Sequence, residues 1–204
     1  MNIRLEEEKD YFEVENLTRE AFWNVYRPGC FEHLVIHNLR REKCFVKDLD
    51  FVIELDGKII ANIVYAKANL KLKNGKEREV LIFGPVSVLP EYQKKGYGEK
   101  LIKFTMNRAK EMGFNEILIT GNPNYYKKYG FESASKYNIF YEGVPEDSEF
   151  PCFMICILNK EKYDILGGIY SDPKCYDIDE AKLEEFDKKF PHKIKEKRAG
   201  QLQL

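Results

Sequence analysis

The segment from Leu89 to Gly98, which reads LPEYQKKGYG, constrains this chain more than any other. A strand-like run, Val80–Val88, leads into the segment, and an amphipathic helical pattern, Glu99–Met112, leaves it. Where a strand passes through glycines into a helix, the first N–H groups of the helix lack helical partners and attract anions. Gly96 would let a phosphate approach the backbone, as would Gly98, and lysines add positive charge nearby: Lys94, Lys95 and Lys100. We therefore expect this loop to bind a phosphorylated ligand.

Two common phosphate-binding patterns do not fit this loop. A Walker loop requires Lys and then Ser or Thr directly after its second glycine, but Glu99 follows Gly98. A dinucleotide-binding fingerprint requires a third glycine three residues after the second, where this chain has Leu101. A different phosphate loop and an ordinary helix N-terminus with a glycine-rich turn both remain open.

The residues Gln93–Gly98 fit a third pattern, Gln/Arg-x-x-Gly-x-Gly/Ala. This pattern resembles the pyrophosphate loop of the GCN5-related N-acetyltransferase (GNAT) superfamily, and Val80–Val88 resembles the family's central strand. The resemblance implies the GNAT fold, an α/β fold with a mixed central sheet and helices on both faces, and acetyl-CoA as cosubstrate. It further implies that the coenzyme contacts the central strand, the loop and a later turn: Val86, Ser87, Val88, Gln93, Lys94, Lys95, Gly96, Tyr97, Gly98, Glu99 and Asn122.

A second motif follows the helix. Phe114–Thr120 predicts a buried strand, and Asn124–Phe131, which reads NYYKKYGF, predicts a short helical turn that Gly130 ends. The turn resembles the family's Tyr-x-x-x-Gly-Phe segment, which implies that Tyr126 is the general acid for the departing thiolate. The alternative is that Tyr126 only packs against other rings, as we expect for its neighbours, Tyr125 and Tyr129.

The resemblance extends over most of the chain, from about residue 4 to about residue 158. It is closest to a bacterial subgroup typified by the YhbS-like acetyltransferases, which carry a strand like Gly84–Pro90, a turn like Asn122–Tyr126 and a C-terminal extension. We expect a GNAT acetyltransferase domain over residues 1–158 and an extension over residues 159–204 that packs on the same domain.

Hydrophobic periodicity and turn residues predict the other elements. The predicted helices of the first half are Tyr11–Trp23 and Phe31–Arg41. The predicted strands are Ile3–Leu5, Phe51–Leu55, Lys58–Leu72 and Phe150–Leu158, with hairpin turns at Asp56-Gly57 and Asn74-Gly75. The extension predicts a strand, Gly168–Tyr170, and a helix, Asp179–Phe190. Strands and helices in this order predict a mixed α/β sheet.

The charge balance and the apolar runs restrict the partners. With 33 basic and 34 acidic residues the net charge is −1, which disfavours nucleic acid as the main partner. No apolar run is long enough to cross a bilayer and no export signal is visible, so we expect no membrane partner and a cytoplasmic protein.

The cysteines and histidines suggest no separate chemistry. The five cysteines include no CxxC pair and predict reduced thiols, with Cys152 and Cys156 on one buried face of a strand. No His/Asn constellation marks a cysteine nucleophile. His33 and His37 have metal-capable spacing, but Leu34 occupies the position of the metalloprotease glutamate, so we expect a structural or solvent-facing pair and no metal.

The acceptor side stays open in the sequence. A general base would help to neutralise the attacking amine, and Glu79, Glu32 and His33 are candidates, each with the alternative of a solvated surface group. The resemblance implies that Phe22–Arg41 and the C-terminal extension select the acceptor, a primary amine of an unidentified small molecule or protein. The oligomeric state is undetermined, and a homodimer stays open.

Two other functional classes compete with an active acetyltransferase. A non-catalytic acyl-CoA-binding protein could sense the ligand through the same loop. A redox or metal protein could use the cysteines and histidines, and metal analysis would exclude it.

Overall fold

A computed structural model describes residues 1–161 and 167–201 of the chain. They form two compact units that interleave along the sequence. The first unit comprises Met1–Val64, Pro85–Ile102 and the residues from Lys174 onward, and the second comprises Tyr65–Gly84 and Lys103–Pro173. Two long strands and one helix therefore contribute residues to both units: β3 (Lys58–Leu72), β4 (Glu77–Val88) and α3 (Tyr97–Glu111).

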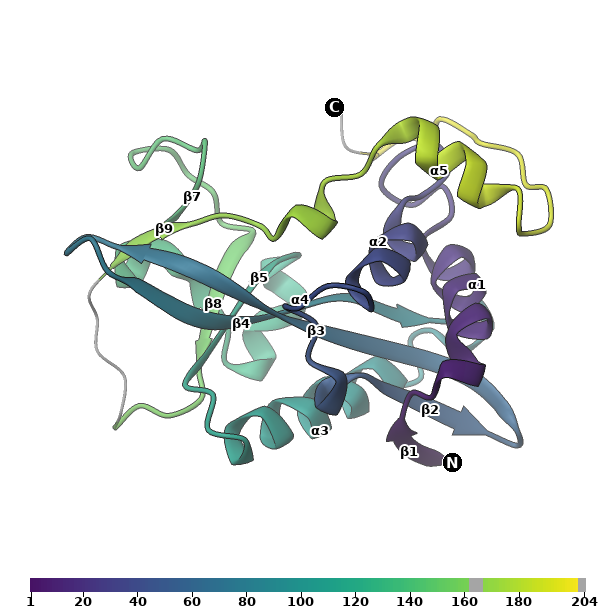
Figure 1. Cartoon of the computed structure of the whole chain (residues 1–204), viewed down its shortest axis with the longest axis horizontal. Helices are drawn as coiled ribbons and strands as arrows, with labels where there is room; N and C mark the ends of the chain where they lie inside the picture. Colours follow the sequence, from purple (N-terminus) through teal and green to yellow (C-terminus); the bar gives the residue numbers. More distant parts are fainter. Residues whose placement is uncertain (162–166, 202–204) are drawn as a thin grey trace. The chain divides into compact units, whose positions relative to one another are not determined.

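In the first unit, an antiparallel set of strands is accompanied by three helices. β1 (Asn2–Leu5) pairs with β2 (Phe51–Leu55), and β2 pairs with the first half of β3. Asp56 and Gly57 both have positive φ in the hairpin between β2 and β3, as the sequence predicts. The helices lie close together in Figure 1, where purple, blue and yellow-green mark them: α1 (Tyr11–Phe22), α2 (Glu32–Leu39) and α5 (Glu180–Asp187).

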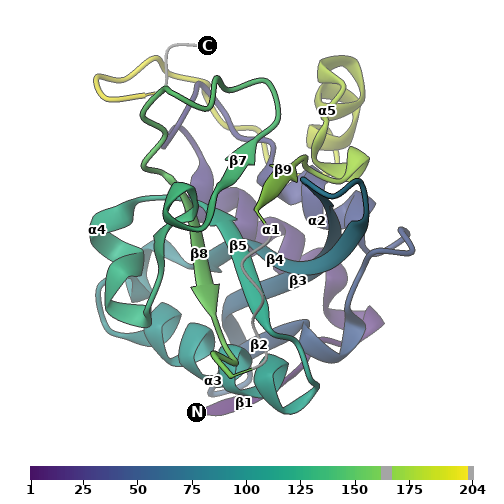
Figure 2. The ribbon, with the colours of Figure 1, turned by 90° about the vertical axis from the view of Figure 1, so that its left-hand side faces the viewer.

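In the second unit, the strand order is β3-β4-β5-β8-β6, with β9 on the other edge of β3. The pairs β4–β5 and β7–β9 are parallel, whereas β5–β8 is antiparallel, and Figure 2 shows β8 alongside β5. The bounds of its further elements are β5 (Glu116–Thr120), α4 (Pro123–Tyr126), β6 (Glu132–Ser133), β7 (Ile139–Tyr141), β8 (Phe153–Ile157) and β9 (Gly168–Tyr170).

Short 3-10 helices connect the longer elements: η1 (Glu8–Asp10), η2 (Lys47–Leu49), η3 (Pro90–Tyr92), η4 (Lys127–Tyr129), η5 (Ala134–Tyr137) and η6 (Lys174–Tyr176). Tertiary packing stabilises each unit separately. In the first, Leu34 of α2 packs with Leu183, Phe186 and Phe190 of residues 174–201, which we call the C-terminal segment. In the second, Phe83 of β4 contacts the rings of Tyr65 and Phe131.

The mixed α/β fold that the sequence predicts is confirmed, and β2, β3 and β9 have the predicted bounds. The two short strands β6 and β7 were not predicted, because two or three residues are too few to show an alternating pattern. The last strand of residues 1–158 begins at Phe153 rather than Phe150. Cys152 consequently lies in a turn and is half-buried, so its expected place beside Cys156 on one strand face is wrong.

Candidate functional site

The loop Gln93–Gly98 lies in the first unit, where β4 ends and η3 leads toward α3. The side-chain amide of Gln93 donates a hydrogen bond to the carbonyl oxygen of Val88 at 3.0 Å, which folds the loop back onto the end of the strand. Lys94 and Gly96 both adopt left-handed backbone conformations, with φ of 59° and 87°. Left-handed residues among ordinary ones turn successive N–H groups to one side, which forms an anion-binding concavity.

The start of α3 adds to this anion site. Lys100 donates its N–H to the carbonyl of Gly96 at 3.0 Å, so Tyr97 and Gly98 precede the first helical hydrogen bond. A Cβ placed on Gly96 would meet no atom within 4 Å, so the space in front of this backbone is open. The predicted lysines are all exposed: Lys94, Lys95 and Lys100. The loop can therefore receive a phosphate group.

The end of β4 departs from regular pairing. Its parallel register with β5 is recorded at Leu81–Ile117 and Ile82–Leu118 within the described chain, although β4 continues to Val88. Gly84 has φ of 146°, a conformation that favours glycine, and Pro85 has no N–H to donate to a neighbouring strand. The edge of β4 that faces away from β3 can therefore offer backbone groups beyond Ile82 to an extended ligand that carries amides.

Among the predicted strand residues, Ser87 is fully buried and donates its hydroxyl to Thr18 Oγ1 of α1 at 2.9 Å. Its side chain is therefore committed inside the first unit, and only its backbone could serve a ligand. Val86 and Val88 point the other way along the strand and are half-buried.

Tyr126 belongs to the second unit, at the end of α4. Its ring lies so close to Gly121 that a Cβ there would be 2.5 Å from Tyr126 Cε2, and it packs against Phe83 with the ring centroids 6.0 Å apart. The following η4 ends at Gly130, whose φ of 89° confirms the predicted left-handed cap. Asn122 accepts the N–H of Asn124 at 2.9 Å, so its side chain caps α4. Tyr126 itself is partly exposed.

The two tyrosines next to Tyr126 differ in burial. Tyr129 is buried, as the packing interpretation predicts. Tyr125 is 39% exposed, yet its ring still meets that of Tyr126 edge-on at 5.0 Å.

Residues 47–133 match the family model of the acetyltransferase (GNAT) domain, and this span contains the loop, the end of β4 and the turn with Tyr126. Over this span the chain is similar to the GNAT acetyltransferases. The predicted closeness to YhbS-like proteins is confirmed as well. Over 137 residues, 65% of this chain and 71% of the relative, it is 29% identical to the uncharacterized N-acetyltransferase YjhQ of Escherichia coli (strain K12). It is 22% identical to the uncharacterized N-acetyltransferase YhbS of the same strain, over 68% of this chain and 78% of YhbS.

Solved structures share the GNAT fold. The crystal structure of Escherichia coli YhbS in complex with CoA matches with a TM-score of 0.74 at 18% identity, over 87% of this chain and 92% of that one. A GNAT family acetyltransferase from Brucella melitensis in complex with acetyl-CoA matches with a TM-score of 0.69 at 24% identity, over 86% of this chain and 97% of that one.

The base candidates differ in environment. Glu79 is exposed in the second unit and pairs with Lys67 at 2.9 Å, as a solvated surface group does. His33 is fully buried and its Nε2 lies 2.9 Å from Asp187 Oδ1, so it is a structural residue without access to a substrate. Glu32 is half-buried at the start of α2, and burial raises the pKa of its carboxyl group.

The second histidine is structural too. His37 Nδ1 lies 2.8 Å from Glu15 Oε1, and burial lowers the pKa of His37. Within residues 1–161 and 167–201, no group of three or more His, Cys, Asp or Glu side chains could hold a metal ion.

Three side chains form a hydrogen-bonded row of a thiol, an imidazole and a carboxylate that was not predicted from the sequence. Cys30 Sγ lies 3.5 Å from His33 Nδ1, and Asp187 contacts the other ring nitrogen of His33. The order resembles a catalytic triad, but Cys30 is 3% exposed, and burial raises the pKa of its thiol. The group is therefore a buried hydrogen-bonded anchor. No sequence signal could reveal it, because Asp187 lies 154 residues beyond His33.

The C-terminal segment holds the loop between α1 and α2, residues 23–31, which we call the α1–α2 loop. Asn24 accepts the N–H groups of Gly29 at 2.7 Å and Glu196 at 3.0 Å, and it donates to the carbonyl of Ile194 at 3.0 Å. Trp23 donates its indole N–H to the same Ile194 carbonyl at 3.0 Å. The loop and the segment therefore form one hydrogen-bonded structure.

Arg19 of α1 fixes the segment from within. Its side chain is 2% exposed, its Nε donates to Asp187 Oδ1 at 2.8 Å and its Nη1 to the carbonyl of Pro191 at 3.1 Å. The guanidinium also lies over the ring of Trp23, 4.2 Å from its centroid.

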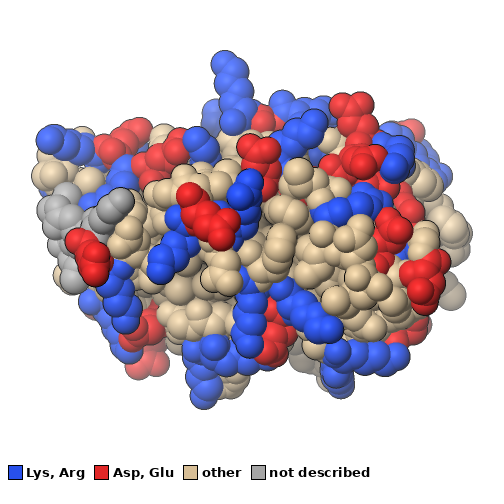
Figure 3. Space-filling model, turned by 90° about the horizontal axis from the view of Figure 1, so that it is seen from below, with Lys and Arg blue, Asp and Glu red and all other residues tan. Residues whose placement is uncertain are grey.

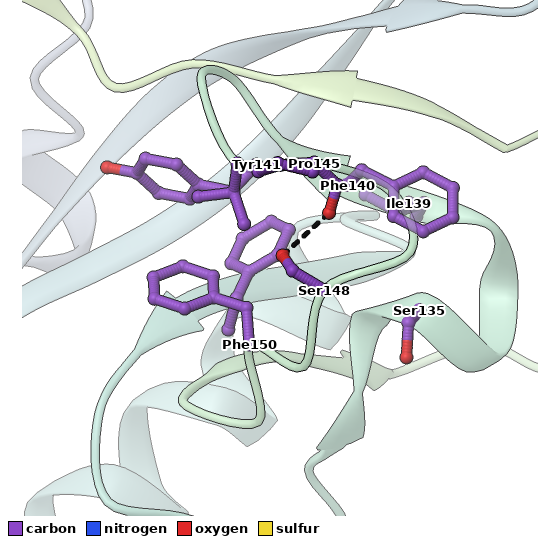
Figure 4. Close-up of a pocket in the computed structure, with 9 residues that line it drawn as sticks. Ser135, Ile139, Phe140, Tyr141, Pro145, Ser148 and Phe150 are labelled. Atoms are coloured by element: carbon purple, nitrogen blue, oxygen red, sulfur yellow. Dashed lines mark hydrogen bonds between the residues drawn. The ribbon is translucent and has the colours of Figure 1, made fainter.

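A recess in the second unit was not predicted from the sequence. It has a cavity volume of only about 20 Å³ and lies beside β7, and Figure 4 shows its largely apolar lining. Ser148 donates its hydroxyl to the carbonyl of Pro145 at 2.7 Å, and the Tyr141 hydroxyl points away from the recess and bonds to Asp172. These hydroxyl groups already have partners, so the recess offers apolar contact.

The surface matches the balanced composition. Figure 3 shows basic and acidic side chains interspersed on the face it presents. No helix in the described parts of the chain has the length and apolar character needed to cross a bilayer.

Proposed function

We propose that this protein transfers the acetyl group of acetyl-CoA to a primary amine of a small molecule or protein. The loop Gln93–Gly98 carries the proposal, because left-handed residues, an open glycine and a helix N-terminus coincide there. The match of residues 47–133 to the GNAT family model supports it, as do the CoA and acetyl-CoA complexes of the proteins with the same fold.

The chain offers groups for each step of this transfer. The coenzyme supplies the thioester. The loop binds the pyrophosphate through backbone N–H groups and lysines, using Gln93, Lys94, Lys95, Gly96, Tyr97, Gly98 and Glu99. The backbone of Val86, Ser87 and Val88 pairs with the amides of the pantetheine arm, and the N–H of Val88 polarises the thioester carbonyl. Asn122 shapes the turn before Tyr126, which protonates the leaving thiolate.

Calorimetric titration with acetyl-CoA tests the loop. Gly96→Glu places a carboxylate in the phosphate site, and Gly75→Glu is its matched control. Both glycines have positive φ, 87° and 80°, and both face open space, so the two variants carry similar backbone strain. We expect Gly96→Glu to lose binding, and Gly75→Glu to bind as the wild type does.

Equal affinities in the two variants would refute the phosphate loop. A wild type that does not bind acetyl-CoA would refute the proposed function itself, and the loop would be an ordinary helix N-terminus.

Tyr126→Phe separates the enzyme from a non-catalytic acyl-CoA sensor. A general acid contributes about 100-fold or more to turnover, so the enzyme should lose that factor in kcat while acetyl-CoA affinity stays unchanged. Tyr125→Phe removes the hydroxyl of the adjacent ring and serves as control. Thiol release with a panel of amines measures both. A sensor would show no thiol release in the wild type, and a packing role would leave both variants as active as the wild type.

We further propose that residues 159–204 complete the domain formed by residues 1–158. β9 pairs with β3 in the second unit, and α5 packs on α2 in the first, which supports this assignment. A cytoplasmic location and a homodimer stay predictions.

A further inference from the structure

Gly121, the residue directly after β5, has no room for a side chain. A Cβ placed on Gly121 would lie 2.5 Å from Cε2 and 3.0 Å from Cδ2 of Tyr126, and its three nearest neighbours all belong to that ring. Carbon atoms in contact are ordinarily about 3.5–4.0 Å apart. An alanine at position 121 and the present position of the Tyr126 ring therefore exclude each other.

The backbone conformation of Gly121 is not what calls for a glycine. Gly121 does not adopt a positive φ, in contrast to Gly130 after the same turn, whose φ is 89°. Residues with a Cβ avoid positive φ, so alanine would not meet that strain at position 121. The obstacle to a side chain at this position is the ring of Tyr126.

The backbone of Gly121 is held on both sides. Its N–H donates to the carbonyl of Cys152 at 2.9 Å, directly beside the pairing of β5 with β8. On the other side, Asn122 caps α4, and its carbonyl accepts the N–H of Tyr126 at 3.1 Å. An added methyl group would therefore displace the ring more readily than the backbone.

Other aromatic rings limit where the Tyr126 ring can move. Its centroid lies 5.8 Å from that of Phe131, 6.0 Å from that of Phe83 and 5.0 Å from that of Tyr125. Phe131 and Phe83 are buried, so they yield little space. A methyl group on Gly121 would shift the Tyr126 ring by about 1 Å to reach ordinary contact distance, and the hydroxyl would move with the rigid ring.

We propose that Gly121 is a positioning residue, which lets the Tyr126 ring lie against the backbone and thereby places its hydroxyl for proton transfer to the leaving thiolate. The inference rests on the proposed acetyltransferase function. In that reaction the amine nitrogen bonds to the acetyl carbon, the C–S bond breaks, and sulfur leaves with its electron pair. Sulfur takes the proton of the Tyr126 hydroxyl, and the proton that the amine loses restores the hydroxyl through solvent.

A double-mutant cycle in kcat tests this role, with thiol release from a panel of amines as the assay. Gly121→Ala should lower kcat about tenfold or more, because a misplacement of about 1 Å can cost on the order of 100-fold. Its acetyl-CoA affinity in calorimetry should equal that of the wild type. In the Tyr126→Phe background the hydroxyl is already absent, so Gly121→Ala should lower kcat by no more than about twofold further. In the control background Tyr125→Phe, Gly121→Ala should keep its full effect.

Urea unfolding tests the contact without an acceptor. Gly121→Ala should lower the midpoint of unfolding while the Tyr126 ring is present. Tyr126→Ala removes the ring, and in that background Gly121→Ala should leave the midpoint unchanged or raise it, because alanine restricts the unfolded chain more than glycine does. This second cycle measures the effect of the ring on position 121 even where Gly121→Ala is unstable.

A Gly121→Ala variant with the kcat of the wild type would overturn the inference, as would a loss of kcat that is equally large with Tyr126→Phe. A decrease in the urea midpoint that is equally large with Tyr126→Ala would overturn it as well, because the ring would then not be the obstacle. A wild type that releases no thiol with any amine marks failure of the proposed function instead, and urea unfolding alone then decides whether Gly121 sets the position of the ring.

Discussion

The two functional loops of the first unit are built in opposite ways. In the loop Gln93–Gly98, the hydrogen bonds span only a few residues, such as Gln93 to Val88 and Lys100 to Gly96. In the α1–α2 loop, Asn24 bonds to residues 170 and 172 positions later in the chain. The first loop is thus specified locally, whereas the second exists only when the C-terminal segment is in place.

The difference fits the two kinds of ligand that we expect at these loops, the coenzyme at the first and the acceptor at the second. A loop set by its own residues can keep one geometry for an invariant ligand such as a pyrophosphate. A loop set by a distant segment can change with that segment, which suits a loop that we expect to meet a variable acceptor. Changes in the α1–α2 loop should therefore alter stability and acceptor use, and changes in the phosphate loop should alter acetyl-CoA affinity.

Arg19→Met should have the largest effect on stability. The variant leaves the Pro191 carbonyl without its donor and Asp187 with His33 as its remaining buried partner, so we expect the free energy of unfolding to fall by about 3–5 kcal/mol. Denaturant titration measures this loss, and calorimetry should show unchanged acetyl-CoA affinity in the folded fraction. An equal loss of acetyl-CoA affinity would break the comparison, because it would show that the two loops are not independent.

Asn24→Ala should have the next largest effect. Asn24 is buried, has positive φ and makes three hydrogen bonds that alanine cannot make, so we expect a loss of about 3 kcal/mol. Asn24→Gly removes the same hydrogen bonds but adopts the left-handed backbone without strain, so it should cost less than Asn24→Ala. Thermal unfolding compares the two variants. Equal losses would mean that the backbone conformation of residue 24 contributes nothing.

The same difference explains what could be predicted from the sequence. Asp56-Gly57 and Gly130 were predicted because a glycine at a turn specifies its own backbone angle. The GNAT loop was predicted for the same reason, since its spacing is contained in one short segment. The site residues that the sequence proposed remain proposals, because their roles concern a ligand.

Residues whose role depends on distant partners could not be predicted. His33 shows no sign in the sequence of its contact with Asp187, and the sequence therefore left it as a base candidate. The sequence does not distinguish Glu79 from Glu32. In the structure, Glu79 is exposed and pairs with Lys67, whereas Glu32 is partly desolvated. Burial decides between such residues, and burial comes from packing over long sequence distances.

Acid should weaken the α1–α2 side through Asp187. Burial alone would raise the pKa of Asp187, but hydrogen bonds from His33 and Arg19 outweigh it, and the pKa is lowered. A lowered pKa contributes stability that is present above the unfolded value of about 4 and is lost as the pH falls through the folded value. We expect Asp187→Asn to cost about 2 kcal/mol at neutral pH, and the difference from wild type to shrink below about pH 4.

Urea unfolding across this pH range measures that difference. As a control, Glu180→Gln removes an exposed carboxylate of the same helix, the partner of Arg27. Its free energy of unfolding should differ only slightly from that of the wild type over the whole pH range. A gap for Asp187→Asn that stays constant down to the lowest pH would exclude Asp187 as the titrating group.

We expect the smallest effects from substitution of two glutamines, one that supports each of the two loops. Gln93→Ala removes the bond to Val88 in an exposed loop, so stability should change by less than about 1 kcal/mol. The same loss of order should raise the acetyl-CoA dissociation constant about two- to fivefold, because the ligand must then order the loop. Gln201→Ala removes a bond to the carbonyl of Asn24 at 2.9 Å and should lower the melting temperature slightly while leaving acetyl-CoA affinity unchanged. Calorimetry measures the acetyl-CoA affinity of both variants, and thermal unfolding measures their melting temperatures. If both variants change mainly the affinity, or both change mainly the melting temperature, the division between a locally specified loop and a loop held by a distant segment is wrong.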